Sequence, residues 1–252
     1  MVERTGAADP ARVLPLLWRT GTRTGRSRLT LDAVVAAGVE LADDVGIEQL
    51  SMRRLADRLG VGAMTVYGHV PGRAELVELM VDQVFAEVRY DDLGEGAAGW
   101  RAGMETVAAR NLELLSHHPW LTDVDTTRPP LGPGTTGKYD AELRPLVGTG
   151  LDDVEIDQAL TLVLDHVRSG ARQLFLAESP PAGTADVDWW EQAGPALAGL
   201  IDPERYPYAT RIGEAAGQVY GAPSDPRRAY AFGLRTILDG IERLIATKRA
   251  PA

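Results

Sequence analysis

The chain has 252 residues, with 26 Lys and Arg against 36 Asp and Glu and a formal net charge of −10 at pH 7. This charge argues against a protein that coats nucleic acid with its whole surface, but it leaves room for a local basic face. The sequence has no Cys, no signal-peptide core and no apolar run of about 18 residues, which excludes disulfides and thiolate chemistry and predicts a cytoplasmic protein without membrane contact.

The first 28 residues show little helical periodicity and end in a basic stretch. Gly, Thr and Ser separate its four Arg, with no acidic residue between them: Arg19, Arg23, Arg26 and Arg28. This composition is typical of a solvated, flexible segment. It also suits an arm that contacts the DNA backbone or minor groove once a neighbouring domain has docked. We therefore expect residues 1–28 to form a flexible basic arm, on which Val13–Trp18 is the stretch suited to anchoring on the protein surface.

Residues 31–43 carry apolar side chains at helical spacing, and Thr30 is the expected N-cap. Residues 51–73 then predict two short helices joined by a tight turn. Ser51 is a good N-cap for the first helix, and Gly60 accepts the left-handed backbone conformation that ends it. Two helices joined by a turn of roughly three or four residues that contains Gly form the helix-turn-helix pattern.

The second helix of such a motif normally lies in the major groove of DNA. Residues 51–73 contain four Arg and a single Asp, and phosphate binding needs such a concentration of positive charge. The alternative is a pair of amphipathic helices that only meet in a core. The residues predicted to contact DNA are Arg28, Ser51, Arg53, Thr65, Tyr67, Gly68, His69 and Arg73.

The stretch LSMRRLADRLGVGAMTVYGHVPGRAELVELM, residues 50–80, resembles the DNA-binding domain of the tetracycline-repressor (TetR) family. The likeness lies in the Leu-Ala-x-x-Leu-Gly-Val core, the Thr-x-Tyr-x-His-Val recognition helix and the Arg-Ala-Glu-Leu start of the next helix. It implies a head with its connecting helix over residues 29–90 and an effector-binding and dimerisation body over residues 91–252. It also implies a homodimer that binds double-stranded operator DNA, with helices 154–177 and 225–248 paired across a two-fold axis.

Polar and aromatic residues of the body predict a small-molecule site. Asn111 lies on the otherwise apolar face of a helix over residues 100–117, and a buried amide must find partners in the core or in a ligand. His118 follows about two turns later, and His166 borders the apolar stripe of helix 154–177. The residues predicted to bind the effector are Asn111, His118, Trp120, Tyr139 and His166. The alternative is that Asn111 and His166 are satisfied inside a solid core.

No metal or cofactor is expected. His117 and His118 are adjacent, so on a helix they point about 100° apart and cannot easily share one ion. Within the resemblance, an ungapped comparison from Leu114 to Pro129 places a magnesium-binding His of the family on Val124, and valine cannot ligate a hard cation. We therefore expect a largely apolar organic effector that is held directly.

The sequence after residue 180 predicts a long, mostly irregular segment followed by a final helix. Residues 180–221 are rich in Pro, Gly and Ala and predict a mostly irregular segment with a short helix over 209–219, suited to cover apolar surface or a pocket. Helix 225–248 carries a wide apolar stripe in which Leu238 and Ile241 are the expected dimer contacts. The predicted fold class is all-α, with an N-terminal helix-turn-helix domain and a C-terminal helical ligand-binding and dimerisation domain.

These observations favour a ligand-responsive transcriptional regulator, a repressor released from a pseudo-palindromic operator by a small organic effector. No recognisable set of catalytic residues is present, so an enzyme is not expected. The alternative function is a helical small-molecule-binding protein or enzyme that keeps the fold without reading DNA. The small residues Ala63 and Gly68 on the recognition helix keep that alternative open.

Overall fold

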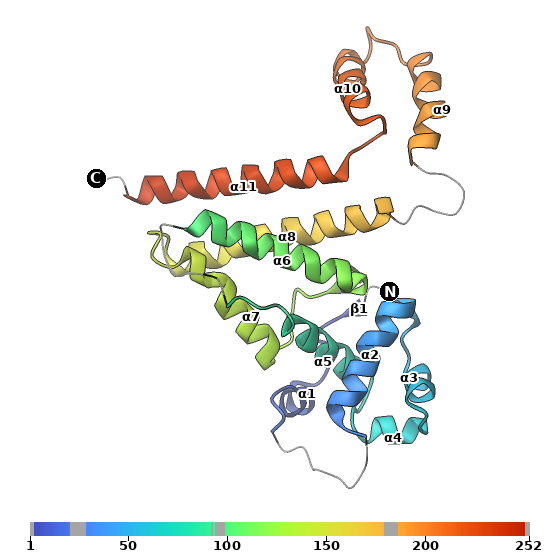
Figure 1. Cartoon of the computed structure of the whole chain (residues 1–252), viewed down its shortest axis with the longest axis vertical. Coiled ribbons are helices and arrows are strands. Elements are labelled where there is room, and N and C mark those ends of the chain that lie inside the picture. The colour runs from blue at the N-terminus through green and yellow to red at the C-terminus, as the bar shows by residue number, and fades with distance from the viewer. Residues whose placement is uncertain (1–2, 21–28, 92, 94–98, 179–185, 250–252) are drawn as a thin grey trace.

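The computed structural model describes residues 3–20, 29–91, 93, 99–178 and 186–249. These residues form an all-α protein with two additional strands of two residues each, which confirms the predicted fold class. A small head carries the helix-turn-helix, and a larger helical body lies beside it (Figure 1). No helix in the described part of the chain is long and apolar enough to cross a membrane.

The head consists of four helices and a 3-10 turn whose ends follow from the caps in the sequence. The Thr30 side chain accepts from the Ala33 amide, and the Ser51 side chain accepts from the Arg54 amide. Gly60 ends the first helix of the motif in the left-handed conformation, with φ 65°. The elements are α2 (Leu31–Val45), η1 (Ile47–Gln49), α3 (Met52–Leu59), α4 (Ala63–Tyr67) and α5 (Arg73–Phe85).

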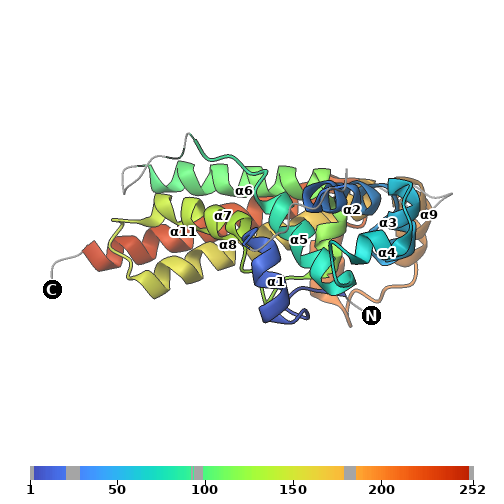
Figure 2. The same ribbon diagram turned by 90° about the horizontal axis from the view of Figure 1, so that it is seen from below.

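The body is built around a long helix, α8, which packs between α6 and the last helix, α11 (Figures 1 and 2). Asp152 starts α8 by accepting from the backbone amides of Val154 and Glu155. Leu160 and Leu238 meet in the core of the body and are almost fully buried. The body elements are α6 (Trp100–His117), η2 (Pro119–Asp123), β2 (Val124–Asp125), α7 (Pro133–Leu143), η3 (Arg144–Leu146), α8 (Asp153–Glu178) and α11 (Pro226–Arg249).

The segment between α8 and α11 is more helical than its composition predicts. It forms α9 (Asp186–Ala198) and α10 (Pro207–Tyr220), which extend away from the rest of the body (Figure 1). Helix α10 contains the predicted short helix, but α9 was not predicted, because Pro195 lies inside it and its apolar pattern is weak. Helix α10 has no fully buried residue, although it contacts α9, where a Cβ at Gly217 would lie 3.5 Å from the Trp190 ring.

The N-terminal residues differ from the expected flexible arm. Strand β1 (Glu3–Arg4) pairs in parallel with β2, and α1 (Pro10–Leu17) packs on α5. The Asp9 side chain caps α1, and Val13 and Leu17 are buried one turn apart. The expectation of a flexible arm is therefore wrong for residues 3–20, while residues 21–28, including the predicted DNA contact Arg28, lie outside the described residues.

Candidate functional site

Helix α4 is held by two buried valines and presents its polar side chains to solvent. Val66 and Val70 are fully buried in the head core and fix the orientation of this short helix. Thr65 is exposed, and the Tyr67 ring is 44% exposed. In the part of the chain that the structure describes, neither side chain has a hydrogen-bond or ion-pair partner. This face is free to meet a partner, as the predicted recognition helix requires.

The neighbouring predicted contacts have more varied surroundings. Gly68 is exposed beside Tyr67, His69 is half-buried, and Arg53 is exposed on α3. The Ser51 hydroxyl is already used as the N-cap of α3. The exposed positions support the predicted surface, whereas the use of Ser51 as a cap leaves it less free for a phosphate.

Arg73 is half-buried at the base of the helix-turn-helix, and its guanidinium is already bonded within the chain. Its guanidinium donates to Glu3 Oε2 at 2.6 and 3.1 Å and to the Ile47 carbonyl at 2.9 Å. A further bond reaches the Leu50 carbonyl. The predicted DNA contact of Arg73 stays a prediction, and the sequence could not show that the distant Glu3 pairs with this residue. Arg73 joins the N-terminal strand to the loops that precede α3.

A cavity of about 480 Å³ opens between α6, α7, α8 and the loop over residues 126–131. Two predicted effector residues, Asn111 and Tyr139, line it. Its walls are mainly apolar, and the Tyr139 hydroxyl donates to Asp157 at 2.7 Å. The apolar lining includes Phe85, Leu114, Leu115, Pro129, Pro130, Leu131 and Leu164. An apolar cavity with a few polar groups is the usual form of a small-molecule site.

A buried polar network forms one wall of this cavity. Glu142 accepts from Tyr90 Oη at 2.5 Å, from Asn111 Nδ2 at 2.6 Å and from Lys138 Nζ at 2.8 Å. Burial raises the pKa of the Tyr90 phenol, and the negative charge of Glu142 adds to this effect. Burial also lowers the pKa of the Lys138 ammonium, although Glu142 opposes that change. Asn111 is thus satisfied within the protein, as the alternative reading of the sequence expected, and it still faces the cavity.

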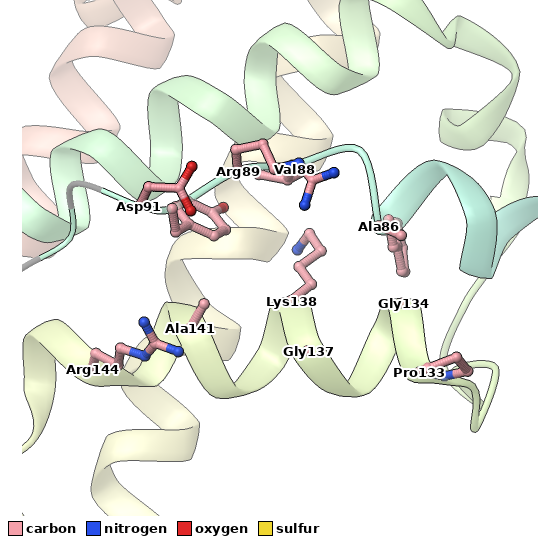
Figure 3. Close-up of a pocket in the computed structure, with 12 residues that line it drawn as sticks. Ala86, Val88, Arg89, Asp91, Pro133, Gly134, Gly137, Lys138, Ala141 and Arg144 are labelled. Carbon is pink, nitrogen blue, oxygen red and sulfur yellow. The ribbon is translucent and has the colours of Figure 1, made fainter. Parts of the chain in front are cut away.

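A second, more polar cavity of about 300 Å³ lies on the other side of Lys138. Phe85 and Lys138 line both cavities, and Lys138 Nζ lies 5.1 Å from the centre of the Phe85 ring. Figure 3 shows the side chains of Arg89, Asp91 and Arg144 around the smaller cavity. The Lys138 and Phe85 side chains therefore form a partition between an apolar chamber and a charged one.

The three other predicted effector residues lie elsewhere. His118 Nδ1 lies 2.8 Å from Asp43 and its Nε2 3.1 Å from Glu87, and Trp120 also donates to Asp43. His118 and Trp120 therefore join the body to the head, because α6 ends at His117 and the predicted helical register stops there. His166 turns toward α11, where Nε2 lies 2.9 Å from the Tyr230 carbonyl and the two rings stack 5.2 Å apart.

The polar network that the sequence did not predict is formed with Asn111 by Tyr90, Lys138 and Glu142. Lys138 and Glu142 are separated by four residues on α7, a spacing that normally indicates an exposed ion pair. Lys138 and Glu142 differ from an exposed ion pair only in being buried against α6, and this burial depends on tertiary packing. Val124 is buried in β2, and no group of three or more potential metal-ligating side chains occurs among the residues with described positions.

Comparisons with known proteins agree with this arrangement. Residues 34–80 match the family model described as bacterial regulatory proteins, tetR family, and residues 93–245 match the tetracyclin repressor-like C-terminal domain. The HTH-type transcriptional repressor DrrR1 of Streptomyces coeruleorubidus is 40% identical, over 98% of this chain and 91% of its own length. The class C tetracycline repressor of Escherichia coli is 25% identical, over 88% of this chain and 94% of its own length.

The solved structures with a similar fold include ActR of Streptomyces coelicolor in complex with actinorhodin. That structure has a TM-score of 0.71 and 23% identity, with 89% of this chain and 100% of ActR covered. At this identity the likeness supports the fold alone. The two family models and the 40% identical relative extend over the head and the body. The chain therefore belongs to the TetR family of bacterial regulatory proteins, which are DNA-binding transcriptional regulators.

Proposed function

We propose that the protein is a homodimeric repressor, released from a pseudo-palindromic operator in the cytoplasm by a small organic molecule. The observation that carries this proposal is the presence, in one chain, of an exposed recognition face on α4, without a side-chain partner among the described residues, and a separate apolar cavity in the body. Helix α5 connects the two, since its Asp82 accepts from the backbone amide and hydroxyl of Thr135, which lines the cavity.

The cavity favours a largely apolar ligand. Three of its polar side chains, Asn111, Lys138 and Glu142, are bonded to one another, and its exposed lining is mainly apolar, so a ligand gains largely from filling the apolar volume. Val124, where the resemblance places a metal-binding His, is buried and lends only its backbone carbonyl, to Arg168. A metal chelate held through that position is therefore not expected. Actinorhodin and (S)-DNPA, which are named as ligands of ActR, are suitable first compounds to test.

The outer faces of α8 and α11 are the proposed dimer interface. Phe232 is 63% exposed and Leu162 51% exposed, and Gly240 of α11 is exposed as well. The earlier candidates Leu238 and Ile241 are only 1% and 3% exposed within a single chain, because they pack into the body. An Arg at either position would therefore test folding of the body and not association. A two-fold dimer would place the two α4 helices on the operator about 34–36 Å apart, which is one turn of DNA, or a multiple of that distance.

The dimer predicts that Phe232→Arg weakens both association and operator binding. Light scattering reports the oligomeric state, and fluorescence anisotropy reports binding to a labelled operator. Tyr208→Arg is the matched control, because Tyr208 is an exposed aromatic residue on α10. A Phe232→Arg protein that stays dimeric would move the interface elsewhere.

The function is tested by selecting a duplex from a random-sequence pool and screening compounds for release of that duplex. Tyr139→Ala should raise the concentration for half-release by about tenfold, or ~1.4 kcal/mol, because Tyr139 lines the cavity. Tyr208→Ala, at an exposed tyrosine outside the cavity, should leave it unchanged. Failure to select any duplex would favour the alternative, a helical ligand-binding protein that does not read DNA.

A further inference from the structure

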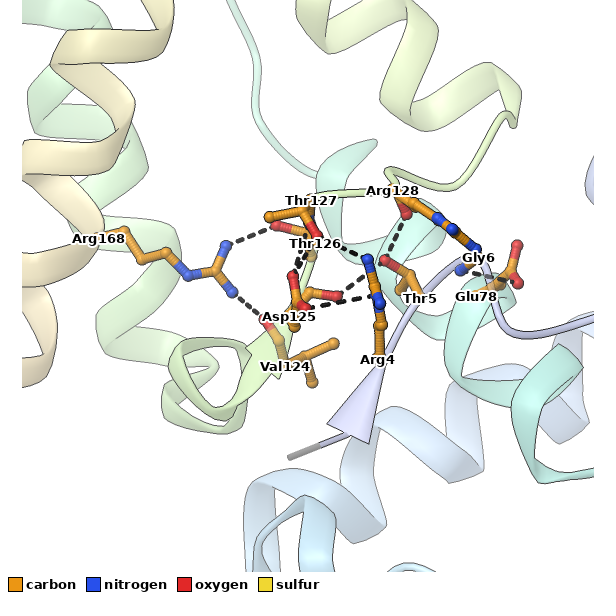
Figure 4. A network of polar contacts seen from close by, with 10 residues as sticks. All are labelled: Arg4, Thr5, Gly6, Glu78, Val124, Asp125, Thr126, Thr127, Arg128 and Arg168. Carbon is orange, nitrogen blue, oxygen red and sulfur yellow. Dashed lines mark hydrogen bonds and ion pairs between the residues drawn. The ribbon is translucent and has the colours of Figure 1, made fainter. Parts of the chain in front are cut away.

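Residues 3–18, called here the N-terminal strap, touch both the head and the wall of the ligand cavity. The strap begins with β1, which pairs in parallel with β2 so that Glu3 lies opposite Val124 and Arg4 opposite Asp125. Thr5 continues this contact, since its hydroxyl donates to the Arg128 carbonyl at 2.7 Å (Figure 4). The strap is therefore bonded to the chain that follows η2 along several consecutive residues.

The first end of the strap is fixed to the head. Glu3 accepts from Arg73, which also donates to the carbonyls of Ile47 and Leu50, just before α3. The amides of Gly6 and Ala8 both donate to Glu78 on α5, at 3.1 and 3.2 Å. Helix α1 then packs along α5 through its buried apolar side chains. The strap thus contacts the base of the helix-turn-helix and the helix that leads from it.

The other face of the strap holds residues 124–131, called here the pocket wall. Trp18 Nε1 donates to the Leu131 carbonyl at 2.8 Å, and Leu131 lines the ligand cavity. Thr126, Pro129 and Pro130 of the wall also line it. From the opposite side, Arg168 of α8 donates to Thr126 Oγ1 at 2.7 Å and to the Val124 carbonyl (Figure 4). The wall therefore lies between the cavity and the strap.

We infer that the strap couples the ligand cavity to the DNA-binding head, and that the attached strap belongs to the DNA-binding form. This inference rests on the proposed function. A ligand that enlarges the cavity displaces the pocket wall, and the displaced wall pulls β1 and Glu3 away from Arg73. The base of α3 then loses its support, and the recognition helices lose their operator spacing. Such coupling requires only that the ligand and the operator favour different positions of one element.

Gly6 is the position at which the strap can be detached without changing any charge. Its φ is +70°, and a Cβ there would lie 2.5 Å from Cβ of Arg128 in the pocket wall. Gly6→Ala therefore combines backbone strain with a clash against the wall. Gly221→Ala is the matched control, because Gly221 also has a positive φ, +60°, but a Cβ there would meet nothing within 4 Å.

The test uses the full chain and the operator duplex selected from the random-sequence pool, with no ligand. Hydrogen exchange of the wall amides is followed with and without the operator, and affinity is measured over a range of salt concentrations. In the wild type and in Gly221→Ala, the operator should slow exchange in the pocket wall, although the wall is part of the body. In Gly6→Ala this protection should disappear, and operator affinity should fall about tenfold with an unchanged salt slope.

Trp18→Phe provides a milder variant, which keeps an aromatic side chain at this half-exposed position and removes the indole N–H that donates to Leu131. It should lose part of the wall protection while its thermal unfolding stays like that of the wild type. The inference is overturned if the operator never protects the wall, or if Gly6→Ala keeps full affinity and protection. A Gly6→Ala protein whose salt slope flattens would show instead that the N-terminal residues contact DNA directly. Failure to bind any duplex would count against the proposed function and not against the strap alone.

Discussion

The polar side chains on the recognition face of α4 and those in the polar wall of the ligand cavity differ in exposure and in hydrogen bonding. Within the described residues, Thr65 and Tyr67 have no side-chain partner and face solvent. Asn111 and Glu142, in contrast, are buried and bonded to each other and to their neighbours. A surface that reads DNA keeps its hydrogen-bonding groups open for bases and phosphates. A cavity wall whose polar groups bond to one another offers a ligand chiefly shape and apolar contact.

The largest effect is expected from breaking the network in the cavity wall. Glu142→Ala removes the acceptor shared by Tyr90, Asn111 and Lys138 and leaves a buried ammonium without its partner. Losing one partner of a buried ion pair typically costs about 3–5 kcal/mol of unfolding free energy. Chemical denaturation of the purified protein measures this cost.

Asp140→Ala is the matched control on the same helix, because the Asp140 side chain is exposed and forms an ion pair with the partly exposed Arg144. Its effect should stay within about 1 kcal/mol, the usual range for an exposed ion pair. Equal stability of the two variants would mean that the network does not support the cavity wall.

A smaller effect, on DNA binding and not on folding, is expected at the recognition face. Tyr67→Ala and Arg53→Ala should each weaken operator binding by about 1–3 kcal/mol, since both side chains are exposed and neither has a partner among the residues that the structure describes. Their unfolding midpoints should match that of the wild type. Arg211→Ala, an exposed Arg on α10, is the control. Full operator affinity in both head variants would remove these residues from the interface.

The smallest effect concerns pH and the strap. Burial raises the pKa of the Glu78 carboxyl, and the nearby charge of Glu75 adds to it, while the amides of Ala8 and Gly6 oppose the change. The folded chain therefore binds this proton more tightly than the unfolded chain. At pH values above the pKa that Glu78 has in the folded chain, the buried ionised carboxyl lowers the free energy of unfolding. As the pH falls through that pKa and then through the lower pKa of the unfolded chain, the carboxyl becomes protonated and this destabilisation disappears.

Glu78→Gln removes this titration. The unfolding free energy of the wild type relative to the variant should therefore rise as the pH is lowered through the carboxyl range. A wild-type advantage that grows with increasing pH would contradict the assigned direction.

The head could be predicted from the sequence because its structure is set by local signals. The caps at Thr30 and Ser51, the left-handed Gly60 and the spacing of the buried valines all act within a few residues. The same reasoning placed α6, α8 and α11 close to their observed bounds. It failed for the N-terminal residues, since the pairing of β1 with β2 joins segments about 120 residues apart, as in the bond from Thr5 to Asp125.

The cavity could be predicted only in part for the same reason. Asn111 was recognisable as a polar group on an apolar helix face, but its partners Tyr90 and Glu142 come from other helices or loops. His118 and His166 were assigned from helical spacing, which says nothing about which neighbour a face meets. Sequence patterns identified which faces are buried, and tertiary packing decided which of them enclose a cavity.

The central claim is that operator and ligand bind in opposition through one conformational equilibrium. The most direct measurement is calorimetric titration of a compound that releases the operator into the free protein and into the protein–operator complex. Linkage requires the operator to weaken ligand binding by the same factor by which the ligand weakens operator binding. We predict equal factors in the wild type. Equal ligand affinity with and without the operator would contradict the account.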